Sequence, residues 1–94
     1  MCETFERLYK IVLDRLEKRP VGSYTVELAS KGRGYVARKL GEEAVEVVVA
    51  SLYEDRKRLV EELADLVYHM MVLMAVNNVS LEDVCAELEK RMKK

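Results

Sequence analysis

Apolar residues recur at intervals of three and four along most of the chain, which is the spacing of amphipathic α-helices. This pattern predicts an all-α fold of four to five helices. The first helix is expected to start at a Thr4 cap and to end at Pro20. A short second helix follows, capped by Ser23 or Thr25. It should stop before two glycines and leave a mobile loop around Arg33.

Two longer helices are expected over residues 35–52 and 55–76, and a last one over residues 80–92 with Ser80 as its cap. Several valines near the end of the first long helix would also suit a strand, but the length of the segment favours a helix. Gly41 within it indicates either the close approach of another backbone or a ligand, or a harmless glycine. The short link near residue 55 predicts that the two long helices are antiparallel neighbours.

The segment 66–76 is apolar on every side of its helix, and His69 is its one strongly polar residue. The segment is too short to span a bilayer, which needs roughly 20 residues, so we expect no membrane partner. A chain of 94 residues encloses only a thin core. We therefore expect a second subunit to cover this helix, in a homodimer or a larger homo-oligomer.

Charge and composition exclude several classes of protein. The formal net charge is −1 and the sequence pI is about 5.9, which argues against a basic surface for nucleic acid. The first fifteen residues carry charges throughout and do not resemble a secretory signal. Cys2 and Cys85 lack the spacing of a zinc site. These features predict a single cytoplasmic domain over residues 1–94.

Carboxylates occur in the same arrangement on both long helices. The long helix over residues 35–52 carries GEEAVE with Glu42, Glu43 and Glu46. The long helix over residues 55–76 carries VEELAD with Glu61, Glu62 and Asp65. Glu43 and Glu46 share one helical face, as do Glu62 and Asp65, so four carboxylates can face each other. Two unit charges about 4 Å apart repel by about 4 kcal/mol at an effective dielectric of roughly 20, so a cation must offset them.

Two interpretations of these carboxylates follow from the residues. Lys39 and Arg58 can offset part of the charge, and oxygen-only ligands suit Mg²⁺, which would indicate phosphate chemistry. Alternatively, the charges decorate a solvated helix face, although the valines around Glu46 leave little room for one. His69 follows Asp65 by one turn and is either a hydrogen-bonded core residue or a contact for metal or substrate.

The combination EExxE and ExxD, formed by Glu42, Glu43, Glu46, Glu62 and Asp65, resembles the metal-binding signature of the MazG-like all-α nucleotide pyrophosphohydrolases. Within that superfamily, four segments are similar to the phosphoribosyl-ATP pyrophosphohydrolase family: SYTVEL (23–28), KLGEEAVEVVVA (39–50), ELADLVYHMMVLM (62–74) and SLEDVCAELEKR (80–91). They cover nearly the whole chain, and SYT, KxGEE and ADLxYH in this order form a specific combination.

This resemblance implies a MazG-like helical bundle completed by oligomerisation. It implies Mg²⁺-dependent hydrolysis of phosphoribosyl-ATP between its α and β phosphates, the second step of histidine biosynthesis. The implied metal ligands are Glu43, Glu46, Glu62 and Asp65. Glu42 or one of these ligands, such as Glu43, would orient the attacking water. The expected substrate contacts are Lys39, Ser23, Tyr24, Thr25, Arg33 and His69, although for Arg33 a solvated loop is the favoured interpretation.

Other functions remain open at this point. A house-cleaning pyrophosphohydrolase of noncanonical or deoxynucleoside triphosphates would keep the chemistry, but the SYT segment and the YH pair disfavour it. A non-catalytic helical interaction module would leave the carboxylates solvated and would need no Mg²⁺. A di-iron bundle normally uses Glu-x-x-His, whereas Asp65 stands at the fourth position here.

Overall fold

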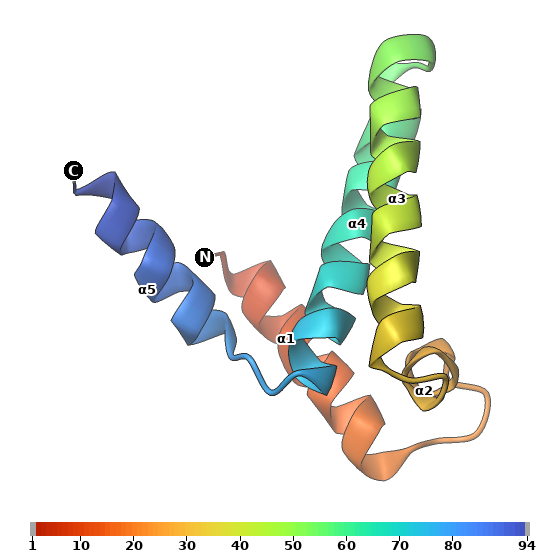
Figure 1. The fold of residues 1–94 in the computed structure, drawn as a ribbon, viewed down its shortest axis with the longest axis vertical. Coiled ribbons are helices and arrows are strands. Elements are labelled where there is room, and N and C mark those ends of the chain that lie inside the picture. Colours follow the sequence, from red (N-terminus) through yellow and green to blue (C-terminus); the bar gives the residue numbers. More distant parts are fainter. Residues whose placement is uncertain (1, 94) are drawn as a thin grey trace.

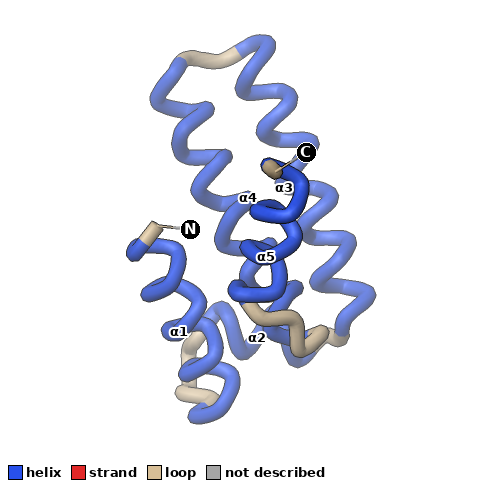
Figure 2. Tube along the Cα trace, turned by 90° about the vertical axis from the view of Figure 1, so that its left-hand side faces the viewer, coloured by secondary structure: helices blue, strands red, loops and turns tan. Residues whose placement is uncertain are grey.

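The computed structural model describes residues 2–93, and every regular element within them is a helix. The helices are α1 (Glu3–Lys18), α2 (Tyr24–Ser30), α3 (Arg33–Tyr53), α4 (Arg56–Val76) and α5 (Leu81–Met92). The two longest, α3 and α4, form an antiparallel hairpin, while α1 and α2 pack against its base (Figure 1). Short links join the five helices (Figure 2). The predicted all-α fold and the antiparallel hairpin are confirmed.

Side-chain caps define where three of the helices begin. Oxygens of Ser23, Asp55 and Ser80 accept hydrogen bonds from the backbone N–H groups three residues further on, at 3.3, 2.9 and 3.0 Å. The prediction for Thr4 is wrong, because α1 begins at Glu3 and Thr4 lies within its first turn. Of the two caps considered for α2, Ser23 holds that position and Thr25 lies inside the helix.

The mobile loop expected around Arg33 is also absent from the described chain, because α3 begins at this residue. Gly32 has a φ of 96°, a conformation that glycine adopts readily, and with Lys31 it forms the short link from α2 to α3. The Arg33 guanidinium donates a hydrogen bond to Oδ1 of Asn77 at 3.3 Å. This contact joins the start of α3 to the end of α4.

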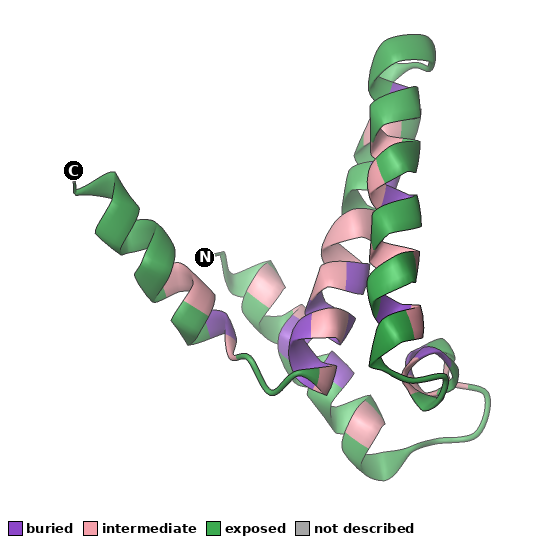
Figure 3. Ribbon diagram, viewed as in Figure 1, coloured by how far each residue is buried: buried purple, intermediate pink, exposed green. Residues whose placement is uncertain are grey.

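The core lies where α1, α2 and the adjoining halves of α3 and α4 meet (Figure 3). Its most deeply buried side chains are Val12, Leu28, Val36, Met71 and Val72. All residues from 66 to 76 are buried or half-buried inside the single chain. Within the single chain, α1, α2 and α3 thus cover much of this helix, and its further cover by a second subunit stays a prediction.

One row of exposed apolar side chains follows α3. Val45, Val48, Val49 and Leu52 expose between 41% and 66% of their surface and occupy positions i, i+3, i+4 and i+7 of the helix. We call these four residues the α3 stripe. Buried Ala50 marks the opposite face, which packs on α4. The back of the hairpin is thus apolar and uncovered in the single chain.

Other parts of the fold bear less on the site. Beyond its chain neighbours and the backbone of its own helix, a Cβ built at Gly41 would meet no atom of residues 2–93 within 4 Å, so no other described segment approaches it closely. The first turn of α5 packs on the core through Leu81 and Val84, while its far end leads away from the rest (Figure 1). Across residues 2–93, the helices are too short or too polar to cross a membrane.

Candidate active site

Carboxylates of α3 and α4 converge midway along the hairpin. Single oxygen atoms of Glu43, Glu62 and Asp65 lie within 4.8 Å of one another. Glu43 and Glu62 expose only 7% and 4% of their surface, whereas Asp65 is exposed, so the cluster opens to solvent on one side. We call these three residues and Glu46 the carboxylate cluster. Its convergence depends on the antiparallel pairing of two helices whose acidic residues repeat every three positions.

Glu46 joins the cluster from the next turn of α3. It is exposed and lines a cavity of about 110 Å³ together with Glu62 and Arg58. Burial raises the pKa of Glu43, the interaction with Glu46 raises it further, and His69 acts in the opposite direction. Burial and the nearby carboxylates therefore both disfavour the charged form of Glu43.

Arg58 forms an ion pair with only one member of the carboxylate cluster, Glu62. Arg58 Nη2 lies 2.6 Å from Oε1 of Glu62, and its Nη1 lies 2.6 Å from Oε1 of Glu61. The other oxygen of Glu62, Oε2, is buried and has no hydrogen-bond partner within the described chain. Leaving a buried charged oxygen unpaired is costly. An oxygen-only donor set with such an orphan atom fits a hard divalent cation such as Mg²⁺.

His69 borders the cluster from α4. Its Nδ1 lies 2.7 Å from the backbone carbonyl oxygen of Asp65, which only accepts, so Nδ1 carries a proton. In the neutral ring Nε2 is then an acceptor, and the Tyr24 hydroxyl lies 3.3 Å from it. The same Nε2 lies 3.9 Å from Oε1 of Glu43. His69 thus lies between a tyrosine of α2 and a carboxylate of α3.

The SYT segment of α2 presents one of its three hydroxyls to this region. Ser23 caps the helix, and Thr25 is buried, with its hydroxyl hydrogen-bonded to that of Tyr68. Tyr24 is 47% exposed. Burial raises the pKa of its hydroxyl, and the positive charge of half-buried Lys39 partly offsets this effect. Direct contact between Thr25 and a substrate would need an exposed hydroxyl, whereas the structure has a buried one.

Residues 5–92 match the protein family described as phosphoribosyl-ATP pyrophosphohydrolase. The chain belongs to this family. The resemblance inferred from the motifs is confirmed, and the family is one of hydrolases.

Curated relatives agree over almost the full length. A protein from Saccharolobus islandicus (strain M.16.27) is 57% identical over 91 residues, which are 97% of each chain. One from Saccharolobus solfataricus is 58% identical with the same coverage, and one from Metallosphaera sedula is 58% identical over 99% of this chain and all of its own. All three are named phosphoribosyl-ATP pyrophosphatase.

Two residues expected from the phosphoribosyl-ATP pyrophosphohydrolase pattern lie away from the cluster. Glu42 is exposed, and its carboxylate pairs with Lys39 at 3.8 Å and with Arg38 at 3.7 Å. Arg33 precedes Glu43 by ten residues, which is about 15 Å along a helix. The described contacts therefore give no direct support for a role of Arg33 at the cluster.

Tyr68 belongs to the apolar segment 66–76, and its contact with the SYT segment was missed by the sequence analysis. Its ring is 5.1 Å from that of His69 and 6.1 Å from that of Tyr24, measured between centroids. Tyr68 follows Asp65 by three residues and so lies near the same helical face, which is the one signal available in the sequence. Its bond to Thr25 spans 43 residues, and no local spacing predicts it.

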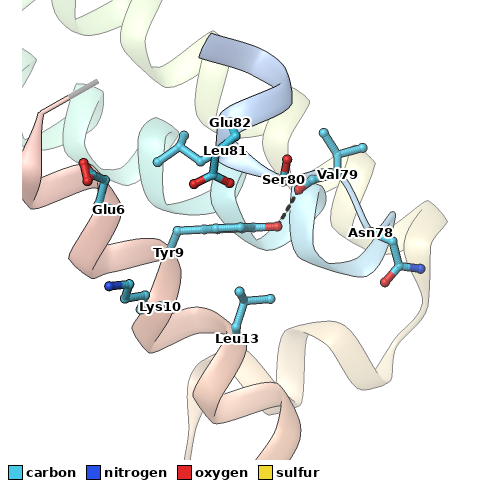
Figure 4. Close-up of a pocket in the computed structure, with 9 residues that line it drawn as sticks. All are labelled: Glu6, Tyr9, Lys10, Leu13, Asn78, Val79, Ser80, Leu81 and Glu82. Atoms are coloured by element: carbon cyan, nitrogen blue, oxygen red, sulfur yellow. Dashed lines mark hydrogen bonds between the residues drawn. The ribbon is translucent and has the colours of Figure 1, made fainter. Parts of the chain in front are cut away.

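A cavity of about 470 Å³ lies apart from the carboxylate cluster, between α1 and the link that joins α4 to α5. Figure 4 shows Tyr9 beneath this link, with its hydroxyl donating a hydrogen bond to the carbonyl oxygen of Val79. Its lining includes none of the residues that the family pattern assigns to metal or substrate.

Proposed function

We propose that the chain hydrolyses phosphoribosyl-ATP between its α and β phosphates, giving phosphoribosyl-AMP and pyrophosphate, in the second step of histidine biosynthesis. Family membership over residues 5–92 supports the substrate. Two observations on Glu62 together carry the proposal. Its Oε2 is buried without a partner in the described chain, and single carboxylate oxygens of Glu62, Glu43 and Asp65 lie within 4.8 Å of one another. A solvated, purely structural helix face would not bury such an atom without a partner.

We infer that Mg²⁺ is held by Glu43, Glu46, Glu62 and Asp65. The bound ion would neutralise the polyphosphate and polarise its phosphorus–oxygen bonds. Arg58 holds Glu62 in place through its 2.6 Å ion pair and limits the rotation of that carboxylate.

The remaining roles fall to side chains that surround the cluster. Lys39 and Tyr24 supply an ammonium group and a hydroxyl to bind phosphate oxygens. In the hydrolysis, the oxygen of water forms a bond to phosphorus, and the bond from this phosphorus to the oxygen that bridges the α and β phosphates breaks. A carboxylate takes the proton of the water. The contacts favour Glu43 over Glu42 for this proton, because Glu43 lies inside the cluster while Glu42 pairs with Lys39 and Arg38.

The active assembly is proposed to be a homodimer. The α3 stripe leaves four adjacent apolar side chains exposed on the helix that also carries Glu43 and Glu46. Contiguous exposed apolar surface of this kind marks a protein–protein contact. A second copy of the chain is the partner that the family resemblance implies.

The test is release of pyrophosphate from phosphoribosyl-ATP by the purified chain, with and without Mg²⁺, beside a panel of deoxynucleoside and noncanonical triphosphates. We expect Mg²⁺-dependent turnover, fastest with phosphoribosyl-ATP. Faster turnover of a common deoxynucleoside triphosphate would contradict the proposed substrate.

A matched pair of variants tests the carboxylate cluster. Glu62→Gln keeps the shape of the side chain and removes its charge, and kcat should fall on the order of a hundredfold or more. Glu61→Gln removes the neighbouring carboxylate, which also lies 2.6 Å from Arg58 but is exposed. It should retain close to full activity. Equal losses in both variants would refute a specific role for Glu62.

A further inference from the structure

The three aromatic rings beside the carboxylate cluster contact each other and come from two helices. Tyr24 belongs to α2, whereas Tyr68 and His69 are adjacent on α4. The ring of His69 meets both tyrosine rings edge-on, at interplanar angles of 76° and 85°. The position of Tyr24 relative to His69 therefore depends on how α2 is held against α4.

One hydrogen bond between side chains joins α2 to α4 at the residue next to Tyr24. It connects the hydroxyls of Thr25 and Tyr68, and Thr25 is 6% exposed. Because α2 has only seven residues, it is too short to be a stable helix without tertiary contacts. A buried polar bond at its first turn fixes the rotation of the helix about its own axis. That rotation decides where the neighbouring Tyr24 side chain points.

The chain of contacts continues to the proposed catalytic carboxylate. The Tyr24 hydroxyl lies 3.3 Å from Nε2 of His69, and Nε2 lies 3.9 Å from Oε1 of Glu43. Nδ1 of the same ring is held by the carbonyl oxygen of Asp65. His69 cannot turn to follow Tyr24 without breaking this bond. The contact between Tyr24 and His69 therefore depends on where α2 places the Tyr24 side chain.

We propose that Tyr68 is a positioning residue for the reaction: its hydroxyl, bonded to Thr25, sets α2 so that Tyr24 lies against His69 beside Glu43. Tyr68 itself touches no reacting group. The proposal rests on the proposed phosphoribosyl-ATP hydrolysis, and it assigns to Thr25 an indirect role in place of substrate contact.

Activity measurements test this role with matched variants. Tyr68→Phe and Thr25→Val each remove one partner of the bond, and kcat/KM for phosphoribosyl-ATP should fall roughly five- to tenfold. Thr25→Ser keeps a hydroxyl and should retain most activity. Tyr9→Phe is the control, because it removes a tyrosine hydroxyl that bonds to Val79 far from the cluster, and it should leave kcat/KM unchanged.

Double variants test whether Tyr68 acts through Tyr24. In a Tyr24→Phe background, Tyr68→Phe should cause no further loss of kcat/KM, because the hydroxyl that it positions is already gone. A purely structural role would give the same fractional loss in both backgrounds. That additive result would overturn the proposal.

His69 provides a readout that does not depend on turnover, because it is the single histidine of the chain. Its ring ¹⁵N signals need no assignment by mutation. At one fixed pH, Tyr68→Phe should shift the Nε2 signal while the Nδ1–H signal persists, and Tyr9→Phe should change neither. If the wild type is active and Tyr68→Phe changes neither kcat/KM nor the Nε2 signal, the positioning role alone is overturned. A wild type that does not hydrolyse phosphoribosyl-ATP would overturn the proposed function, and this proposal with it.

Discussion

Glu62 has two carboxylate oxygens in different situations. One is bonded to Arg58 at 2.6 Å, and the other is buried without a partner in the described part of the chain. If Mg²⁺ binds the folded state at this oxygen, it stabilises the protein by about 2.7 kcal/mol at a hundredfold excess over Kd. Thermal unfolding followed by circular dichroism should show a higher Tm with Mg²⁺ for the wild type and for Glu61→Gln, and no increase for Glu62→Gln. The same increase in all three proteins would place the ion elsewhere.

The sequence predicted single residues well where a helical period governs them. Spacing along each helix put Glu43 with Glu46 and Glu62 with Asp65, and one antiparallel contact between helices brought the pairs together. The bond between Thr25 and Tyr68 was not predictable in this way. It depends on the angle at which a short helix meets α4, and this angle is set by packing that leaves no period in the sequence.

Helix boundaries were predictable where a side chain caps the first turn, as at Ser23 and Ser80. Helix boundaries were not predictable where the backbone alone makes the turn. α1 starts without a side-chain cap, and α3 starts at Arg33 after a single glycine with positive φ, although the glycines around Arg33 indicated a loop. Glycine favours loops on average, but here Lys31 and one glycine in the left-handed region suffice to join two helices.

At the level of elements, Tyr9 ties α1 to the link before α5, and this tie should weaken at high pH. Its hydroxyl donates to the carbonyl oxygen of Val79, and burial, with a smaller effect of Glu82, raises its pKa above the usual 10.0. An ionised hydroxyl cannot donate. The stabilisation, about 1 kcal/mol, is therefore complete below about pH 10 and lost as the pH rises through the raised pKa.

Denaturant unfolding of the wild type and Tyr9→Phe at several pH values measures this effect. The difference in the free energy of unfolding should be constant from neutral pH to about pH 10 and should then shrink. Taking the difference removes the contribution of the other tyrosines. A difference of zero at every pH would show that Tyr9 contributes through its ring alone, and a difference that persists at full size above that range would contradict the loss of the bond on ionisation.

For the whole molecule, the question is what covers the α3 stripe. The sequence predicted an oligomer from its apolar content but assigned the contact to residues 66–76, much of which α1, α2 and α3 cover within one chain. Periodicity identified that helix as apolar all round, but it could not show which apolar faces the rest of the chain would cover. The stripe lies on the helix that carries Glu43 and Glu46, so a dimer formed there would also brace the carboxylate cluster.

Val48→Glu tests this contact, because Val48 lies within the stripe and is 56% exposed in the single chain. In a dimer, the new carboxylate would be buried without a partner, and the dissociation constant should rise on the order of a hundredfold. Sedimentation velocity over a range of concentrations should show a dimer for the wild type and a monomer for Val48→Glu. Val21→Glu is the control, because Val21 is fully exposed in the link between α1 and α2 and should leave the dimer intact. A monomeric wild type, or a Val48→Glu protein that still dimerises as tightly, would exclude the α3 stripe as the interface.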